Sequence, residues 1–140
     1  MKREYPDRPI VGVGAVIVDQ GRVLLSRRGS PPLIGQWSLP GGVVELGETL
    51  RTAVERESLE ETGLIVEARE VLEVFDRIIP GGDGRTQFHY VLVDFLCSVK
   101  GGELRAGGDV SEVAWAREDE LEKFKLESPA LGVIVKAFRQ

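Results

Sequence analysis

Hydrophobic residues follow two different spacings along this chain, and the shorter spacing predicts strands. Residues 10–18 are rich in valine, isoleucine and glycine, and residues 22–25 follow an Asp-Gln-Gly turn. Together they predict a β-hairpin whose two strands are central in the sheet. Residues 66–79 and 86–99 predict a longer hairpin, joined by a glycine-rich tip that begins at Pro80.

The spacing becomes helical after this first hairpin. Leu50, Ala53 and Val54 recur at the period of a helix and Gly63 supplies a stop, which predicts one helix over residues 49–62. The other predicted elements are a strand at 110–115, a short acidic turn or helix at 118–122 and a C-terminal helix at 129–138. Residues 29–36, with Pro31 and Pro32, predict an exposed loop. The elements indicate a mixed α/β architecture with at least two helices covering the strands.

Length and composition narrow the function classes. A chain of 140 residues with 42% hydrophobic positions is predicted to form a single domain over residues 1–140. No apolar run approaches the roughly 18 residues that cross a bilayer, so we expect a cytoplasmic protein without a membrane partner. The net charge of −5 argues against a broad nucleic-acid-binding face. The single cysteine, Cys97, excludes an internal disulfide, and we expect a buried thiol.

The predicted helix over 49–62 carries carboxylates where its hydrophobic stripe should continue. At 100° per residue, Glu57 and Glu61 fall on the stripe of Ala53 and Val54, with Glu60 at its edge. Carboxylates three and four residues apart repel each other unless a positive charge lies among them, and hard divalent cations such as Mg²⁺ favour oxygen ligands. The alternative is a solvated acidic face held in exposed ion pairs with the arginines of the helix.

The residues around these glutamates favour the cation site. The stretch GVVELGETLRTAVERESLEETGL resembles the Nudix box, whose pattern is G-x5-E-x7-R-E-U-x-E-E-x-G-U with U aliphatic. The one departure is Ser58 at the first aliphatic position, where the hydroxyl could bond back to the preceding turn. The matching positions are Gly42, Glu48, Arg56, Glu57, Glu60, Glu61 and Gly63.

This resemblance implies a Nudix hydrolase with an α/β/α sandwich fold and a mixed sheet. It implies hydrolysis of a phosphoanhydride bond in a nucleoside diphosphate derivative, with Mg²⁺ or Mn²⁺ as the cofactor. The metal ligands would be Glu57, Glu60 and Glu61 together with the backbone of Gly41. Arg56 would orient the glutamates, and Glu48 would either support the metal ligands without touching the metal or help to position a metal-bound water. The candidate ligand outside the box is Glu112, which could equally be a surface acid beside a strand.

The substrate has to be inferred from residues outside the box. Arg27 and Arg28 end a strand near the predicted site, where they suit phosphate binding or are simply solvated strand-end charges. Pro80 resembles a proline of the ADP-ribose pyrophosphatase subgroup, although its turn-forming role explains it equally well, and Arg85 follows in the same hairpin tip. Asp94 is unusual at a strand centre and could face the substrate or pair with an arginine.

We therefore expect a small nucleotide as the partner, with ADP-ribose or a similar compound favoured. The alternatives are hydrolysis of nucleoside triphosphates and a Nudix-like module that senses a nucleotide without cleaving it. Small members of this family are often homodimers, so a homodimer is a further expectation.

Overall fold

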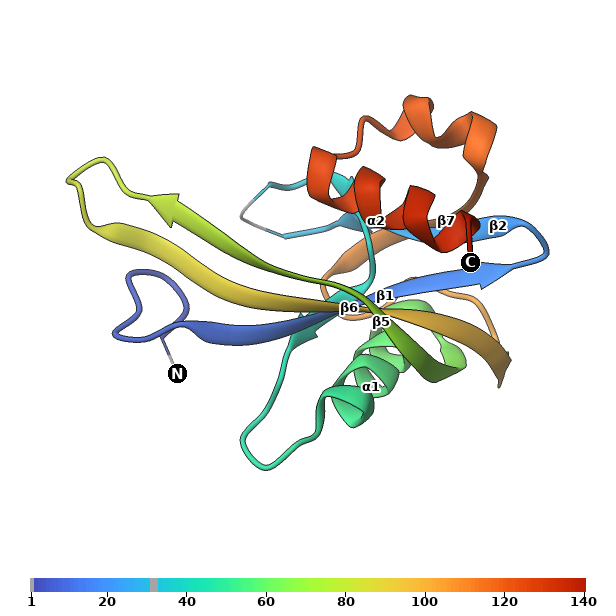
Figure 1. Ribbon diagram of the computed structural model, residues 1–140, viewed down its shortest axis with the longest axis horizontal. Helices are drawn as coiled ribbons and strands as arrows, with labels where there is room; N and C mark the ends of the chain where they lie inside the picture. The colour runs from blue at the N-terminus through green and yellow to red at the C-terminus, as the bar shows by residue number, and fades with distance from the viewer. Residues whose placement is uncertain (1, 31–32) are drawn as a thin grey trace.

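The computed structural model describes residues 2–30 and 33–140, and it has a mixed sheet with a helix on each face (Figure 1). Pro31 and Pro32, which belong to the predicted loop, lie outside the described residues. The strands and helices confirm the predicted α/β/α arrangement. In chain order they are β1 (Ile10–Asp19), β2 (Arg22–Arg28), β3 (Trp37–Ser38), β4 (Gly41–Val43), α1 (Leu50–Thr62), β5 (Leu64–Pro80), β6 (Thr86–Gly102), β7 (Val110–Arg117), the 3₁₀ helix η1 (Glu118–Phe124) and α2 (Ser128–Phe138).

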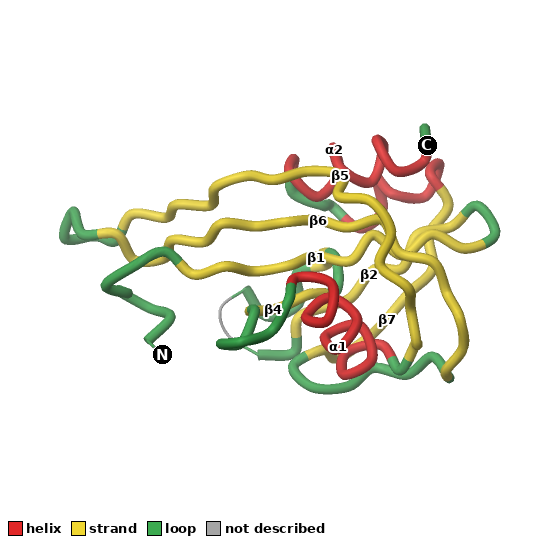
Figure 2. The backbone as a smooth tube through the Cα atoms, turned by 60° about the horizontal axis from the view of Figure 1, so that its bottom comes forward, coloured by secondary structure: helices red, strands yellow, loops and turns green. Residues whose placement is uncertain are grey.

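Strand β1 organises the sheet, whose order is β3-β2-β1-β6-β5. It runs parallel to β6 and antiparallel to both β2 and β4, while β7 pairs with β2. Both predicted hairpins are confirmed. The first turns through Gln20 and Gly21, which both have positive φ, as a two-residue turn between right-twisted strands requires. The second, β5–β6, extends on both sides of its predicted range and forms a long arm beside β1 (Figure 2).

Two hydrophobic cores lie on opposite faces of this sheet, because successive side chains of a strand point to opposite sides. Val13 and Phe95 belong to the core under α1, together with Ala53 and Val54 of that helix. The other core holds Val16, Val23, Leu25, Leu72, Ala116, Leu121, Val133, Ile134 and Ala137, and it lies under α2. Each helix is therefore held to its own face of the sheet.

Helix α1 begins and ends where its sequence predicts. The side chain of Thr49 accepts a hydrogen bond from the backbone nitrogen of Thr52, and Gly63 ends the helix with a φ of 75°. The hydroxyl of Ser58 donates to the carbonyl of Val54 at 2.7 Å, the back-bonding that its position allows. The predicted buried stripe was wrong at Leu50, which is 36% exposed because it lies in the first turn, before the residues that pack on the sheet.

In the described residues, no helix combines the length and the apolar character needed to cross a membrane.

Candidate active site

The C-terminal end of α1 is fixed by the loop that follows β6. Backbone nitrogens of Gly107, Arg105 and Glu103 donate to the carbonyls of Glu61, Thr62 and Gly63 at 2.9–3.1 Å. The last carbonyls of a helix have no partner within the helix, so this loop satisfies them. The sequence reasoning did not assign this loop a role, although glycine allows the close backbone approach seen at Gly102, which ends β6, and at Gly107 in the loop. The loop holds the turn that carries the acidic residues of the helix.

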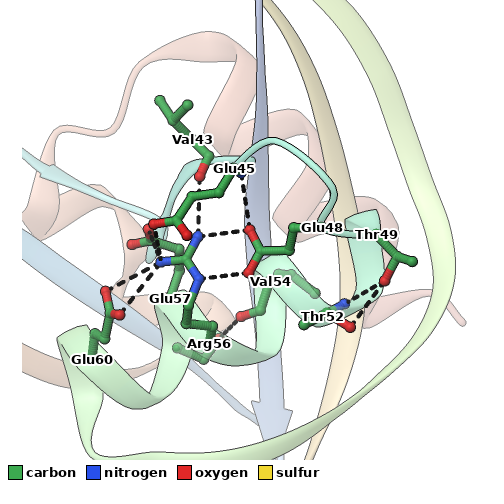
Figure 3. Close-up of polar contacts among 10 residues, drawn as sticks. Val43, Glu45, Glu48, Thr49, Thr52, Val54, Arg56, Glu57 and Glu60 are labelled. Carbon is green, nitrogen blue, oxygen red and sulfur yellow. Dashed lines mark hydrogen bonds and ion pairs between the residues drawn. The ribbon is translucent and has the colours of Figure 1, made fainter. Parts of the chain in front are cut away.

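Arg56 lies at the centre of the acidic side chains of this region (Figure 3). Its guanidinium donates to both carboxylate oxygens of Glu48, at 2.6 and 2.9 Å, and to Glu57 at 2.8 Å. A longer contact of 3.4 Å reaches Glu60, and the carbonyl of Val43 accepts a further bond at 3.2 Å. A planar guanidinium with several donors suits such a multiple contact. Arg56 therefore joins the loop before α1, strand β4 and the helix itself.

Glu48 and Arg56 reinforce each other's charge. The hydrogen bonds from Arg56, with a backbone bond from Glu45, lower the pKa of Glu48 to about 2. The Glu48 hydrogen bond in turn raises the pKa of Arg56 above its usual range. Glu48 therefore stays ionised and bound to Arg56. Its role among these acids is to hold the Arg56 guanidinium in place.

Glu57 lies against β4 because Gly42 leaves room for it. A Cβ atom at Gly42 would collide with the carboxylate of Glu57, so only a glycine allows this approach. The side chain is 14% exposed, and burial raises the pKa of Glu57 in spite of the ion pair with Arg56. Gly42 is thereby a steric requirement of the site.

Glu61 reaches the neighbouring residue of β4. Its Oε1 accepts a hydrogen bond from the backbone nitrogen of Gly41 at 3.0 Å. Burial raises the pKa of Glu61 to about 7, and the nearby charge of Glu57 acts in the same direction. The charge of Arg28 favours the ionised form but does not outweigh burial. A cation near Glu57 and Glu61 would therefore relieve both desolvation and mutual repulsion.

The carboxylates of Glu57, Glu60 and Glu61 are suitable ligands for a hard divalent cation in chemical type and charge. In this structure, however, they do not point toward one common position. Among the described side chains, no group of three or more His, Cys, Asp or Glu residues is arranged to hold a metal ion. The reason lies in their present partners, since Glu57 and Glu60 face Arg56 while Glu61 faces the backbone of Gly41. Metal binding at these residues requires the side chains to turn toward one another.

The remaining predicted residues of β2 and β7 form a separate pair. Arg27 donates to Glu112 at 2.8 Å and to the carbonyl of Gly35 at 3.0 Å, and both side chains are about half exposed. Glu112 thus has an arginine as its partner. Arg28, the next residue of β2, is close enough to Glu61 for its charge to favour the ionised form of that acid.

Arg85 lies in the turn that joins β5 to β6. This end of the long hairpin lies away from α1 (Figures 1 and 2). Its guanidinium binds Asp83 at 2.6 Å and lies 4.3 Å from the ring centre of Tyr5. Pro80 ends β5 beside the same tip. The structure does not bring Arg85 and the acidic residues of α1 together.

Comparison with known proteins agrees with this geometry. Residues 8–138 match the model of the NUDIX domain. An ADP-ribose pyrophosphatase of Methanocaldococcus jannaschii is 42% identical over 104 residues, which is 74% of this chain and 59% of that protein. A MutT-like protein of Streptomyces ambofaciens is 36% identical over 86% of this chain and 71% of its own length. A solved NUDIX hydrolase from Nitrosomonas europaea superposes with a TM-score of 0.78 at 23% identity, covering 92% of this chain and 88% of that one.

Proposed function

Because this chain belongs to the NUDIX domain family, we propose that it hydrolyses a phosphoanhydride bond in a nucleoside diphosphate derivative. The observation that carries the proposal is the approach of Glu57 and Glu61 to the glycines of β4, with Arg56 and Glu48 beside them. Burial raises the pKa of both Glu57 and Glu61, and such perturbed acids are typical of functional sites.

Each residue has a part in this proposal that follows from its present contacts. Arg56 holds the carboxylates of Glu57 and Glu60 on one side of α1, and Glu48 holds Arg56. Glu57, Glu60 and Glu61, with the backbone of Gly41, would bind divalent cations, for which we favour Mg²⁺ over Mn²⁺. Bound divalent cations neutralise pyrophosphate oxygens and make an attacking water more acidic.

Residues outside the box have weaker support. Arg28 is the stronger candidate for a phosphate contact because its charge acts on Glu61, an acid of the box. Arg27 forms an ion pair with Glu112. A direct role of Glu112 as a metal ligand would first require the loss of the Arg27 ion pair. Arg85 would act only through movement of the hairpin tip.

ADP-ribose, or a related nucleoside diphosphate linked to a second group, is the substrate class we favour. The support is the relative from Methanocaldococcus jannaschii, which is 42% identical and is an ADP-ribose pyrophosphatase. The match spans only 59% of that protein, so we expect the loops of this chain outside the box to decide its own substrate.

The test compares kcat/KM for ADP-ribose, a nucleotide sugar, a dinucleotide polyphosphate and a panel of nucleoside triphosphates at fixed Mg²⁺. We expect ADP-ribose or another diphosphate derivative to be preferred. Preference for a triphosphate by more than tenfold in kcat/KM, or about 1.4 kcal/mol in the transition state, would overturn the proposed substrate class. It would not contradict the proposal that the protein is a hydrolase. Tight nucleotide binding without hydrolysis of any member of the panel would instead support the sensing module.

A further inference from the structure

Asp94 is a buried carboxylate at the centre of β6. It is 5% exposed, although its neighbours in the strand are hydrophobic. Val93 and Phe95 point into the core under α1, so Asp94 points to the opposite face of the sheet, the face that α2 partly covers.

Gly14 of β1 makes the space for this carboxylate. The two residues are direct partners in the parallel pairing of β1 and β6. A Cβ atom at position 14 would collide with Oδ1 of Asp94, so any residue larger than glycine would require the carboxylate to move. The sheet is thus shaped to hold a carboxylate at this point.

Asp94 has no partner for its charge among residues 2–30 and 33–140. The described residues give it neither a hydrogen bond nor an ion pair, and the residue opposite it on β5 is another acid, Glu73, which pairs with Lys136 at 3.5 Å. Buried polar groups in proteins almost always have a hydrogen-bond partner, so an exception needs an explanation. In the described part of the chain, Ser98 Oγ is the one enclosed side-chain polar atom without a partner, so the Asp94 oxygens keep some access from outside.

The position of Asp94 relates it to the candidate active site. Gly14 pairs with Asp94 on one side and with Gly41 on the other, and the backbone nitrogen of Gly41 donates to Glu61. Asp94 and Gly41 are therefore two strand spacings apart, roughly 10 Å across the sheet. A nucleoside attached to a phosphate at Gly41 could extend over that distance.

We propose that Asp94 is a specificity residue that accepts a hydrogen bond from an N–H or O–H donor of the substrate's nucleoside. This inference rests on the proposed function for the identity of the ligand. It accounts for the Asp94 carboxylate without a hydrogen-bond donor among the described residues, for the space left by Gly14 and for the distance between Asp94 and Gly41. It assigns the nucleoside to the sheet face opposite α1.

The test measures binding of AMP to the metal-free protein by calorimetry, so that hydrolysis does not enter. Asp94→Leu, which is close in size but has no acceptor, should weaken AMP binding at least tenfold, and Asp94→Asn, which keeps an oxygen, should restore part of the loss. Removing the negative charge of Asp94 would by itself strengthen the binding of the anionic AMP. Weaker binding of AMP to Asp94→Leu would therefore indicate the loss of a hydrogen bond. Asp76→Asn is the matched control, since Asp76 is an exposed acid on the adjacent strand, and it should bind AMP within twofold of wild type.

Two analogues locate the donor. Purine riboside 5′-monophosphate lacks the 6-amino group, and 2′,3′-dideoxyadenosine 5′-monophosphate lacks the sugar hydroxyls. The analogue that lacks the group donating to Asp94 should bind the wild-type protein weakly. Its affinity should not fall further in Asp94→Leu. Equal AMP affinity for wild type and Asp94→Leu, or the same loss for all three probes, would overturn the inference.

The proposed function has its own separate readout. A wild-type protein that hydrolyses ADP-ribose while Asp94→Leu binds AMP normally refutes the role of Asp94 alone. A protein that hydrolyses no nucleotide but shows the donor-dependent binding refutes the hydrolase alone. A melting temperature for Asp94→Leu at or above that of wild type shows that the variant is folded, because replacing an unpartnered buried charge by an apolar group removes a desolvation cost.

Discussion

Two glutamates of the same motif have opposite electrostatic environments. Arg56 lowers the pKa of Glu48 to about 2, whereas burial raises that of Glu61 to about 7. Glu48 already has its cation in the form of an arginine, whereas the hydrogen bond that Glu61 accepts comes from the neutral backbone N–H of Gly41. Of these two acids, Glu61 is therefore the one that gains more from an added positive charge.

Glu61→Gln is expected to lower kcat by at least about 10²-fold, or about 2.7 kcal/mol of barrier, because an amide is a poor ligand for a divalent cation. The amide oxygen can still accept the hydrogen bond from Gly41, so the fold should survive. Steady-state kinetics at saturating Mg²⁺, together with a melting curve in chelator, measures both effects. The melting temperature should be unchanged or higher, since a buried charge is removed.

Glu55→Gln is the matched control for this substitution. Glu55 lies on the same helix and also accepts a backbone N–H, that of Ala68 at 2.9 Å, but it faces β5. Its kcat should remain close to that of wild type. Near-normal turnover of a folded Glu61→Gln protein would remove Glu61 from the cation site.

At the scale of elements, the sequence predicted α1 well because its signals are local. The cap at Thr49, the stop at Gly63 and the back-bonding of Ser58 each depend on residues within one turn. The buried face was predicted less well. Ser58 and Thr62 are fully buried and Leu50 is not, because tertiary packing and satisfied hydroxyls decide burial more than residue type does.

The spacing between β4 and α1 leads to a second prediction. Gly42→Ala should reduce kcat at least tenfold, because the added methyl group displaces the Glu57 carboxylate while every charged residue remains. Gly101→Ala is the control, since a Cβ there meets only Ile65 at 3.9 Å and should leave kcat unchanged. Kinetics and melting curves of both variants make the comparison. A folded Gly42→Ala protein with full activity would show that Glu57 does not need its present position.

At the scale of the whole molecule, the candidate site depends on contacts that no local pattern contains. Gly41, Gly14 and Asp94 form one row across β4, β1 and β6, although they lie far apart along the chain. The parallel pairing of β1 with β6 has no turn to indicate it, so the sequence identified the acids of the box but not this row. The sequence also left open whether Asp94 pairs with an arginine, and the structure shows that within the described residues it does not.

The same buried acids set the pH dependence of the whole protein's stability. Burial raises the pKa of Glu61 to about 7, that of Asp94 to about 6 and that of Glu57 above its usual value. A carboxyl group whose pKa is higher in the folded state binds its proton more tightly there, so its contribution to stability is full below the unfolded pKa and is lost as pH rises through the folded one. The acids with lowered pKa values, Glu48, Asp83, Glu120 and Glu127, act in the opposite sense, but only below their ordinary pKa values near 4.

Between pH 5 and 7.5 the free energy of unfolding in chelator should therefore fall as pH rises. One pKa unit corresponds to about 1.4 kcal/mol, so a fall of about 3 kcal/mol is an upper bound for the part due to Glu61. Denaturant titrations at three pH values measure this pH dependence, and Asp94→Asn and Glu61→Gln should each make it less steep.

Mg²⁺ should raise the melting temperature more at pH 7.5 than at pH 5.5, because a cation binds the ionised acids of the folded protein. A metal-free stability that rises with pH across this interval, or a Mg²⁺ effect that is equal at both pH values, would show that these buried carboxylates do not govern the response.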